Sequence, residues 1–337
     1  MPDMTPERLG AIVDQFSTMT VAVVGDIILD RYLSGRADRL SAEAPVPVVD
    51  VQDQSFSVGG AANVANNIRS LGARALLFGV VGEDRGADTV TGRLQELGMD
   101  TGGILRDPGR PTTTKLRVIA NGQQVVRADM ESTAPIGPDL ERRLLDRLQE
   151  QIGFVDAVIL EDYNKGLLGP NLIRKVIQVA RDRHKIIVVD PKFDNFLEYR
   201  GVTLFKPNRR ETESVLGIRI PDVEAIRKVS EDLMNRLDCD NVMITLSERG
   251  VALLERGGKF SILPARVRAV HDTSGAGDTA VSAVTLALAA GARPPESVTL
   301  ANYAAGAICE KLGVEPVTID DILEAIQHHR QMDGDLL

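Results

Sequence analysis

The strongest chemical signal in the sequence is the string DTSGAGDT at positions 272–279, directly before an apolar, helix-like stretch over 280–290. Small residues let the backbone approach a ligand closely, and a helix start offers unpaired N–H groups and the positive end of the helix dipole. The string therefore predicts an anion site. Asp278 would repel a resting phosphate there, but it could act as a base toward an attacking hydroxyl.

Two other interpretations of this string remain open. The residues from Gly275 to Ala280 match the G-x-G-x-x-A pattern of dinucleotide-binding dehydrogenases, although Asp278 would then face the pyrophosphate. The string could also be only an Asp or Thr helix cap with glycines for a tight turn. For the whole string we favour the anion site. A binding module without catalysis would have no need of a carboxylate at that place.

A second glycine-rich segment, GGAAN at 59–63, precedes the helix predicted over 62–71. Bare backbone at Gly59 and Gly60 could approach a polyol, and Asn63 can both donate and accept hydrogen bonds with hydroxyls. A plain strand-to-helix turn is an equal alternative. Asp30 follows the first predicted strand, so we expect it at the carboxyl edge of the sheet, where such folds bind ligands.

Asn208 and Glu211 lie three positions apart at another predicted helix start. They could hold a hydrated magnesium ion near phosphates, or they could form only a capping box. Two further loops, DYNKG at 162–166 and DPK at 190–192, place an acid and a lysine at the same edge of the sheet. Lysines there could bind a phosphate, although solvated loop charges are the alternative.

These motifs are carried by alternating strand-like and helix-like segments. Strands are predicted over 21–25, 75–81, 157–160, 186–190, 203–206 and 242–246, and helices over 62–71, 86–97, 140–152, 172–183 and 223–237. Such alternation implies right-handed crossovers and a parallel sheet covered on both faces. We therefore expect one α/β domain over 1–337, doubly wound, with a mainly parallel sheet.

Two segments interrupt the alternation. The chain over 31–56 has an extended pattern, and the chain over 112–130 contains Asn121-Gly122, which suits a two-residue hairpin turn. No predicted helix covers these strands, so we expect a small β-sheet outside the main core. It would serve as a lid over a site or as a dimer surface.

Composition excludes several classes of function for these 337 residues. A net charge of −9 argues against a nucleic-acid or anionic-membrane surface, and two cysteines cannot build a disulfide framework. The four histidines lack the spacing of a zinc enzyme. The N-terminus does not resemble a signal peptide and the longest apolar run is too short to span a bilayer, so we expect a cytoplasmic protein.

The segments 59–63 and 272–278, in this order, resemble the two signatures of the ribokinase-like (PfkB) sugar kinases. The resemblance covers essentially the whole chain, including the lid segments, and implies a kinase that uses ATP and Mg²⁺, with K⁺ in some relatives. Strings at 25–32, 41–49, 59–68, 113–118, 161–166, 189–192 and 206–211 are similar to those of the members that phosphorylate D-glycero-β-D-manno-heptose 7-phosphate at C1. A sibling kinase acting on another sugar, sugar phosphate or nucleoside is the alternative.

The heptose kinases make the 1,7-bisphosphate on the route to the ADP-heptose of lipopolysaccharide, and in many bacteria they are fused to a nucleotidyltransferase. This sequence ends soon after the last expected kinase helix and has no HxGH-type motif, so we expect the stand-alone form. The resemblance also implies a homodimer, with the lid as its interface.

The resemblance further implies a role for each matching residue. Asp278 would be the general base, and the N–H groups of Gly275, Ala276 and Gly277 would stabilise the transferring phosphoryl group. Matching positions would hold the nucleotide and Mg²⁺ (Asn208, Glu211, Thr245, Ser247, Gly250, Asn302), a monovalent cation (Asp272) and the sugar (Asp30, Gly59, Gly60, Asn63).

The phosphate on C7 of such a sugar must also meet cations. Lys115 and Arg117 have the same parity on a predicted lid strand and so point the same way. Lys165 and Lys192 are expected at the sheet edge. Any two of these four could bind the phosphate, and the sequence does not choose between them.

Overall fold

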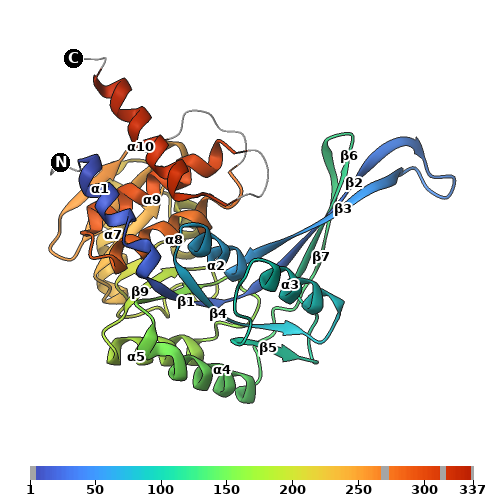
Figure 1. Ribbon diagram of the computed structural model, residues 1–337, viewed down its shortest axis with the longest axis horizontal. Coiled ribbons are helices and arrows are strands. Elements are labelled where there is room, and N and C mark those ends of the chain that lie inside the picture. Colours follow the sequence, from blue (N-terminus) through green and yellow to red (C-terminus); the bar gives the residue numbers. More distant parts are fainter. Residues whose placement is uncertain (1–4, 267–272, 312–315, 335–337) are drawn as a thin grey trace.

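The computed structural model describes residues 5–266, 273–311 and 316–334. Its centre is a nine-stranded sheet in the order β13-β12-β11-β10-β9-β8-β1-β4-β5 (Figure 1). The strands are β1 (Thr20–Gly25), β4 (Arg74–Gly82), β5 (Ile104–Asp107), β8 (Ala157–Glu161), β9 (Ile186–Asp190), β10 (Leu204–Phe205), β11 (Asn241–Thr245), β12 (Val251–Glu255) and β13 (Phe260–Leu263). Neighbours pair in parallel except β12, which is antiparallel to β11 and β13.

Helices cover both faces of this sheet. In β1, Val21 and Val23 belong to one apolar core and Ala22 and Val24 to the other, because successive side chains of a strand point to opposite faces. The first core is covered by α1 (Pro6–Val13), α2 (Ala61–Ser70), α3 (Arg85–Glu96), α8 (Ala276–Ala289), α9 (Pro294–Cys309) and α10 (Ile319–Gly334), and the second by α4 (Pro138–Gln151), α5 (Pro170–Asp182), α6 (Arg209–Leu216) and α7 (Val223–Leu237). The doubly wound α/β fold is confirmed.

Several elements lie outside the predicted set. β5 and β13 are short strands at the two edges of the sheet, and such strands have little pattern of their own. α9 is buried along almost its whole length against α8 and α10. A helix that is apolar all round lacks the one-sided period by which a helix is recognised in a sequence.

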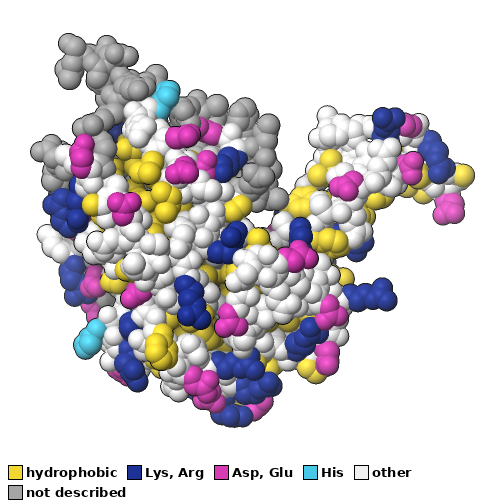
Figure 2. Space-filling model, in the orientation of Figure 1, with side chains coloured by type: hydrophobic (Ala, Val, Ile, Leu, Met, Phe, Trp, Pro, Cys, Tyr) yellow, Lys and Arg dark blue, Asp and Glu magenta, His cyan; other side chains and the backbone are white. Residues whose placement is uncertain are grey.

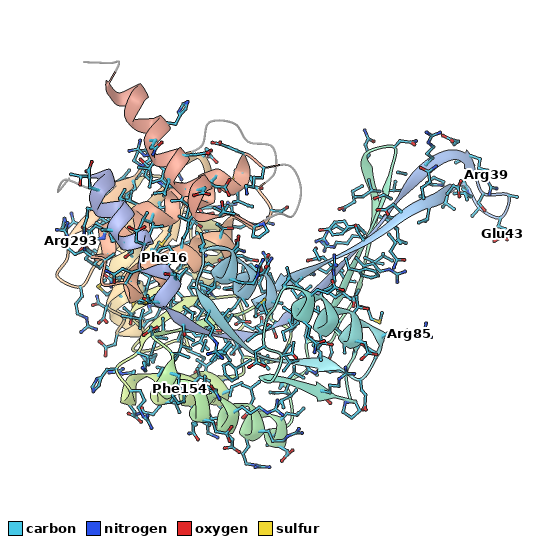
Figure 3. The ribbon with its side chains drawn as sticks, in the orientation of Figure 1. Phe16, Arg39, Glu43, Arg85, Phe154 and Arg293 are labelled. Carbon is cyan, nitrogen blue, oxygen red and sulfur yellow. The ribbon has the colours of Figure 1, made fainter. Side chains whose placement is uncertain are left out.

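A second sheet of four strands, in the order β3-β2-β6-β7, projects from the body (Figure 1). It consists of β2 (Ile27–Leu40), β3 (Pro47–Gly60), β6 (Thr114–Ala120) and β7 (Gln123–Met130). Asn121 and Gly122 turn the second hairpin with φ values of 53° and 78°. This is the small sheet expected outside the core, and we call it the lid. Arg39 and Glu43 lie at its far end (Figure 3).

The surface of the body carries both signs of charge. On the face shown in Figure 2, basic and acidic side chains are interspersed, without one large patch of a single sign. In the part of the chain that the structure describes, no helix combines the length and apolarity needed to cross a membrane. Cys239 and Cys309 are both buried, and no disulfide joins them.

Candidate active site

Asp278 lies in the first turn of α8. The helix begins at Ala276, one turn before the predicted start at 280, and Gly275 caps it in a left-handed conformation with φ 80°. The expected helix start was therefore wrong, because the small residues of the motif are helical themselves. Asp278 is 7% exposed and stands among N–H groups that have no partner within the helix.

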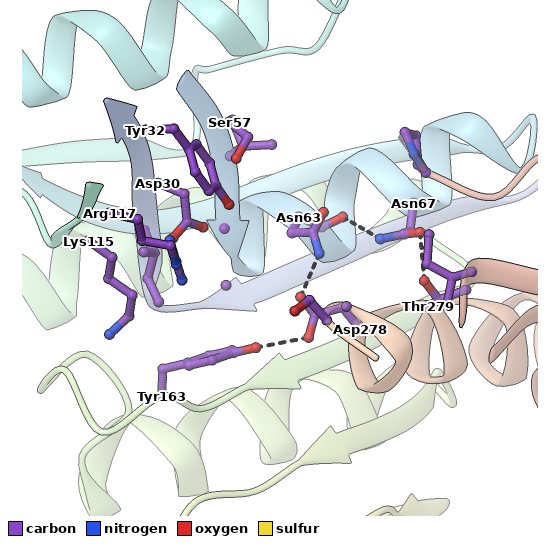
Figure 4. A pocket seen from close by; sticks show the side chains of 18 of the residues that line it. Asp30, Tyr32, Ser57, Asn63, Asn67, Lys115, Arg117, Tyr163, Asp278 and Thr279 are labelled. Carbon is purple, nitrogen blue, oxygen red and sulfur yellow. Dashed lines mark hydrogen bonds and ion pairs between the residues drawn. The ribbon is translucent and has the colours of Figure 1, made fainter. Parts of the chain in front are cut away.

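Both carboxylate oxygens of Asp278 accept hydrogen bonds (Figure 4). Oδ2 accepts from Asn63 Nδ2 at 2.7 Å, and Oδ1 accepts from the Tyr163 hydroxyl at 2.9 Å. Tyr163 is held in turn by its own N–H, which donates to the buried carboxylate of Asp26 at 2.9 Å. These bonds fix the carboxylate between α2 and the loop after β8. Sequence reasoning gave Tyr163 no role of its own.

Gly59 and Gly60 end β3, and both approach other groups too closely for a side chain. A Cβ at Gly59 would lie 2.3 Å from Asp30 Oδ2, and a Cβ at Gly60 would lie 2.3 Å from the Asp26 carbonyl oxygen. Gly60 also has φ 57°, which favours glycine. The two glycines therefore let α2 begin directly beside the lid strand that carries Asp30.

A cavity of 460 Å³ opens between the starts of α2 and α8 and the lid (Figure 4). Its polar lining comes from the body (Asn63, Asn67, Tyr163, Ser274, Asp278, Thr279) and from the lid (Asp30, Tyr32, Ser57, Lys115, Arg117, Gln124). The volume falls in the usual range of small-molecule sites, about 300–1,000 Å³. The cavity therefore brings the predicted base and the predicted sugar residues together.

Asp30 does not lie at the carboxyl edge of the main sheet, as the sequence predicted. It lies inside β2, opposite Ser57 of β3 and Lys115 of β6. The physical reason is that the chain leaves β1 and enters the lid almost without a connecting loop. The Asp30 carboxylate forms an ion pair with Arg117, and both side chains line the cavity.

The cations predicted for the distal phosphate fall into two groups. Lys115 and Arg117 both line the cavity, on the side of the lid (Figure 4). Lys165 belongs with them, because Glu131 bridges the two lysines: its carboxylate lies 2.8 Å from Lys165 Nζ and 3.7 Å from Lys115 Nζ. Lys192 is not part of this group.

Three buried carboxylates meet at the carboxyl edge of the main sheet. Oxygens of Glu161, Asp190 and Asp278 all lie within 4.8 Å of one another. Glu161 and Asp190 are register partners at the ends of β8 and β9, and Lys206 Nζ pairs with Asp190 Oδ2 at 2.7 Å. Among the described residues, no group hydrogen-bonds to the buried Oε2 of Glu161. We call Glu161, Asp190 and Asp278 the acid cluster.

Sequence reasoning singled out Asp278 and Asp190 separately, but it missed Glu161 and the meeting of the three carboxylates. The available signal was that Glu161 and Asp190 are each the last residue of a β-branched run. That signal places both at the same edge, but it does not say that these two strands are neighbours or that α8 begins beside them.

Burial dominates the electrostatics of the acid cluster. Burial raises the pKa of Asp278, although hydrogen bonds from Asn63 and Tyr163 oppose the shift. Burial raises the pKa of Glu161 well above its usual value, and repulsion from Asp190 and Asp278 adds to the effect. For Lys206 burial favours the neutral form, but the charge and hydrogen bond of Asp190, together with the charges of Glu161 and Glu211, outweigh the burial and raise the pKa.

We expect Glu161→Gln to stabilise the chain at about pH 8 and to lose that advantage toward about pH 4.5, the usual pKa region of a glutamate. A group whose folded pKa is raised contributes stability at low pH and loses it as pH rises through the folded pKa. Thermal unfolding with EDTA present, at several pH values, measures the difference in Tm. Glu231→Gln, an exposed partner of Arg227 in α7, is the control. A gain in Tm that does not depend on pH would contradict the raised pKa of Glu161.

The donors of the acid cluster fit a hard divalent cation. Mg²⁺ prefers carboxylate oxygens, and the buried Oε2 of Glu161 accepts no hydrogen bond from any residue that the structure describes. Glu161 and Asp190 are the residues placed to hold such an ion. Asp278 lies beside them with both oxygens already bonded to Asn63 and Tyr163.

Asn208 and Glu211 form the capping box that their spacing left open. Asn208 Oδ1 accepts from the Glu211 N–H at 2.8 Å, and Glu211 Oε2 accepts from the Asn208 N–H at 2.9 Å. The other oxygen of Glu211 pairs with Lys192, whose Nζ lies 5.2 Å from the ring centre of Tyr163. Lys192 thus contacts Glu211 and not the lid. Both oxygens of Glu211 are thus already engaged, so a contact of Glu211 with Mg²⁺ would have to pass through water.

The residues expected at the nucleotide lie along the next strands of the sheet. Thr245 ends β11 and forms a bridge with Asn208. Ser247 and Gly250 turn the chain into β12 with φ values of 55° and 87°. Asn302 lies in α9 and its amide donates to the carbonyl of the residue that follows β13, at 2.7 Å. The structure brings Thr245 and Asn208 together directly.

The N–H groups proposed for phosphoryl stabilisation lie at the start of α8. The Ala276 N–H donates to the Thr273 carbonyl at 3.3 Å. A Cβ at Gly277 would lie 3.8 Å from Asp190 Oδ2, so this glycine lies beside the acid cluster. Asp272, the residue predicted near a monovalent cation, lies outside the described residues.

The chain is similar in sequence to a family of known proteins. Residues 19–320 match the model of a family described as pfkB family carbohydrate kinase. The chain is 40% identical over 332 residues to the bifunctional protein HldE of Trichlorobacter lovleyi, covering 98% of this chain and 68% of that one. It is 42% identical over 323 residues to the HldE of Geobacter sulfurreducens, covering 96% of this chain and 66% of that one.

The fold also matches a solved structure. Arabidopsis thaliana ribokinase, complexed with ribose and ATP, superposes with a TM-score of 0.73 over 91% of this chain and 98% of that chain. At 19% sequence identity this likeness shows a shared fold. The chain spans about two thirds of the length of the two HldE relatives.

Proposed function

This chain belongs to the pfkB family of carbohydrate kinases, and we propose that it transfers the γ-phosphoryl group of ATP to the anomeric C1 hydroxyl of D-glycero-D-manno-heptose 7-phosphate. The product would be heptose 1,7-bisphosphate, a precursor of the ADP-heptose of lipopolysaccharide. The resemblance of the seven sequence strings to heptose kinases supports the choice of sugar, and the family supports the use of ATP.

One observation carries the proposal: the cavity has a base at one end and cations at the other. Asp278 can accept a proton from a hydroxyl. Lys115 and Arg117 offer positive charge to a second, anionic group of the same substrate. A sugar that carries both a reactive hydroxyl and a distant phosphate has the matching chemistry.

In this mechanism the residues mainly position groups and stabilise charge. The sugar hydroxyl takes the place of one donor on the Asp278 carboxylate, which accepts the hydroxyl proton as the oxygen attacks the γ-phosphorus. The bond between the γ-phosphorus and the β–γ bridging oxygen breaks, and ADP leaves with that oxygen. The N–H groups of Gly275, Ala276 and Gly277 stabilise the developing negative charge. Mg²⁺ held by Glu161 and Asp190 would neutralise charge on the phosphates of ATP.

The nucleotide is proposed to lie over the ends of β9, β10 and β11. Asn208, Thr245, Ser247 and Gly250 line that edge. Lys192, which contacts Glu211 on this side, is better placed for the ATP phosphates than for the distal phosphate of the sugar. Asn302 is proposed beside the adenine.

We also propose that two copies of the chain associate through their lids. Apolar side chains lie exposed on the lid strands and their connection, at Leu40, Val46, Val51, Val125, Val126 and Met130. A small open sheet with exposed apolar side chains usually associates with another surface, because association removes these side chains from water. Sedimentation velocity is expected to show a dimer, and a concentration-independent monomer would contradict it.

The sugar assignment is tested by kinetics with purified protein, Mg-ATP and a panel of acceptors. Heptose 7-phosphate, unphosphorylated heptose, fructose 6-phosphate and ribose are compared by ADP release. We expect the highest kcat/KM with heptose 7-phosphate. Turnover of fructose 6-phosphate or ribose without turnover of heptose 7-phosphate would contradict the sugar while leaving the family unchanged.

A further inference from the structure

We propose that Glu131 sets the affinity of this site for phosphorylated sugars, because its carboxylate competes with the sugar's distal phosphate for Lys115 and Lys165. This inference rests on the proposed function, since it assumes that the acceptor carries a phosphate. It concerns a residue that no motif singled out. Glu131 follows directly after the last residue of β7.

The geometry is that of one anion shared by two cations. Glu131 Oε1 accepts from Lys165 Nζ at 2.8 Å, and Oε2 lies 3.7 Å from Lys115 Nζ. The two lysines come from different parts of the chain: Lys115 from β6 of the lid and Lys165 from the loop after β8. A carboxylate between two ammonium groups has the charge and the two-sided geometry that a phosphate oxygen pair would also have.

The Glu131 carboxylate is an incomplete partner for this position. Its Oε2 is buried, and no described residue forms a hydrogen bond with it. A phosphate monoester carries a charge of about −1.5 to −2 at neutral pH and has three strong acceptor oxygens. Phosphate would therefore satisfy both lysines better than the carboxylate does, and its binding requires that Glu131 give way.

Contacts other than those with Glu131 hold Lys115 and Lys165 in position. The Lys165 N–H donates to Asp26 Oδ2 at 3.1 Å, and the Lys165 carbonyl accepts from the Arg110 guanidinium at 2.9 Å. Lys115 lies in the register of β6 and β7, opposite Asp129, whose carboxylate is 3.4 Å from its Nζ. Removal of the Glu131 charge should therefore free the lysines without displacing them.

The expected consequence is a selective change in affinity. In Glu131→Gln, the KM for heptose 7-phosphate should fall about 1.4- to 5-fold, the range that follows from a partly exposed ion pair of about 0.2–1 kcal/mol. The kcat should remain near wild type, because Asp278 and the acid cluster are untouched. The KM for unphosphorylated heptose should not change, and inorganic phosphate should inhibit more tightly by a similar factor.

Two further variants show whether Glu131 competes with the sugar phosphate or only holds the two lysines in position. Glu231→Gln removes one negative charge from an exposed ion pair in α7 and should leave every constant unchanged. Lys165→Gln should raise the KM for the phosphorylated sugar, and in that background Glu131→Gln should bring little further gain. An unchanged or raised KM for heptose 7-phosphate in Glu131→Gln overturns the inference, since it would mean that Glu131 only supports the lysines.

The activity of the wild type distinguishes a wrong sugar assignment from a wrong role for Glu131. If the wild type does not phosphorylate heptose 7-phosphate but turns over another acceptor, the sugar assignment fails. The role of Glu131 is then decided by inorganic phosphate as an inhibitor of that reaction. Tighter inhibition of Glu131→Gln than of wild type supports the inference, and equal inhibition overturns it.

Discussion

Asp278→Asn is expected to lower kcat on the order of 10²-fold or more, the usual scale for loss of a general base. Asparagine keeps the size of the side chain and can still form hydrogen bonds with Asn63 and Tyr163, but it cannot accept the proton of a sugar hydroxyl. The loss should therefore appear in kcat, while the affinity for ATP, measured by calorimetry, stays near the wild-type value.

The stability of Asp278→Asn shows whether its loss of activity comes from a damaged fold. Burial raises the pKa of Asp278 within a group of three acids, so removal of its charge should leave the chain at least as stable as wild type. Asp146→Asn, a change at an exposed partner of Arg142 in α4, is the matched control for activity. Near-wild-type turnover of Asp278→Asn would remove Asp278 from the role of base.

Lys206→Met is expected to lower the free energy of unfolding by about 3–5 kcal/mol, the usual cost of removing one partner of a buried ion pair. Lys206 is 2% exposed, and its Nζ lies 2.7 Å from Asp190 Oδ2. Without the ammonium group, Asp190 would keep a buried charge beside Glu161 and Asp278 with no ion-pair partner among the described residues. Urea denaturation at neutral pH measures the loss.

The double variant Asp190→Asn with Lys206→Met distinguishes a lost ion pair from lost packing. It removes both charges, so it should recover much of the stability that the single change loses. No recovery, or a loss below about 1 kcal/mol in the single variant, would show that the pair is worth no more than a surface contact.

The sequence predicted those features that depend on local pattern. The alternation of strands and helices led to the doubly wound sheet, and the extended segments with Asn121-Gly122 led to the lid. The DTSGAGD string pointed to the start of α8 as the place of the chemistry. Each of these features repeats along the chain or lies within a few residues.

Features that depend on distant contacts could not be predicted. The acid cluster exists because β8 and β9 are neighbours in register and α8 begins beside them. Asp30 was misplaced because nothing in the residues after β1 shows that the chain enters a different sheet. The division of the cations likewise depends on acids far away in sequence, Glu131 for Lys165 and Glu211 for Lys192.

This site is proposed to place a phosphoryl group on C1 of a sugar that already carries a phosphate. Phosphorus NMR of the product formed from Mg-ATP and heptose 7-phosphate shows where the new phosphate lies. We expect two sugar-phosphate signals of equal area, with the new one coupled to the anomeric proton. A new phosphate on any other carbon, or ADP release without a second sugar-phosphate signal, would contradict this proposal.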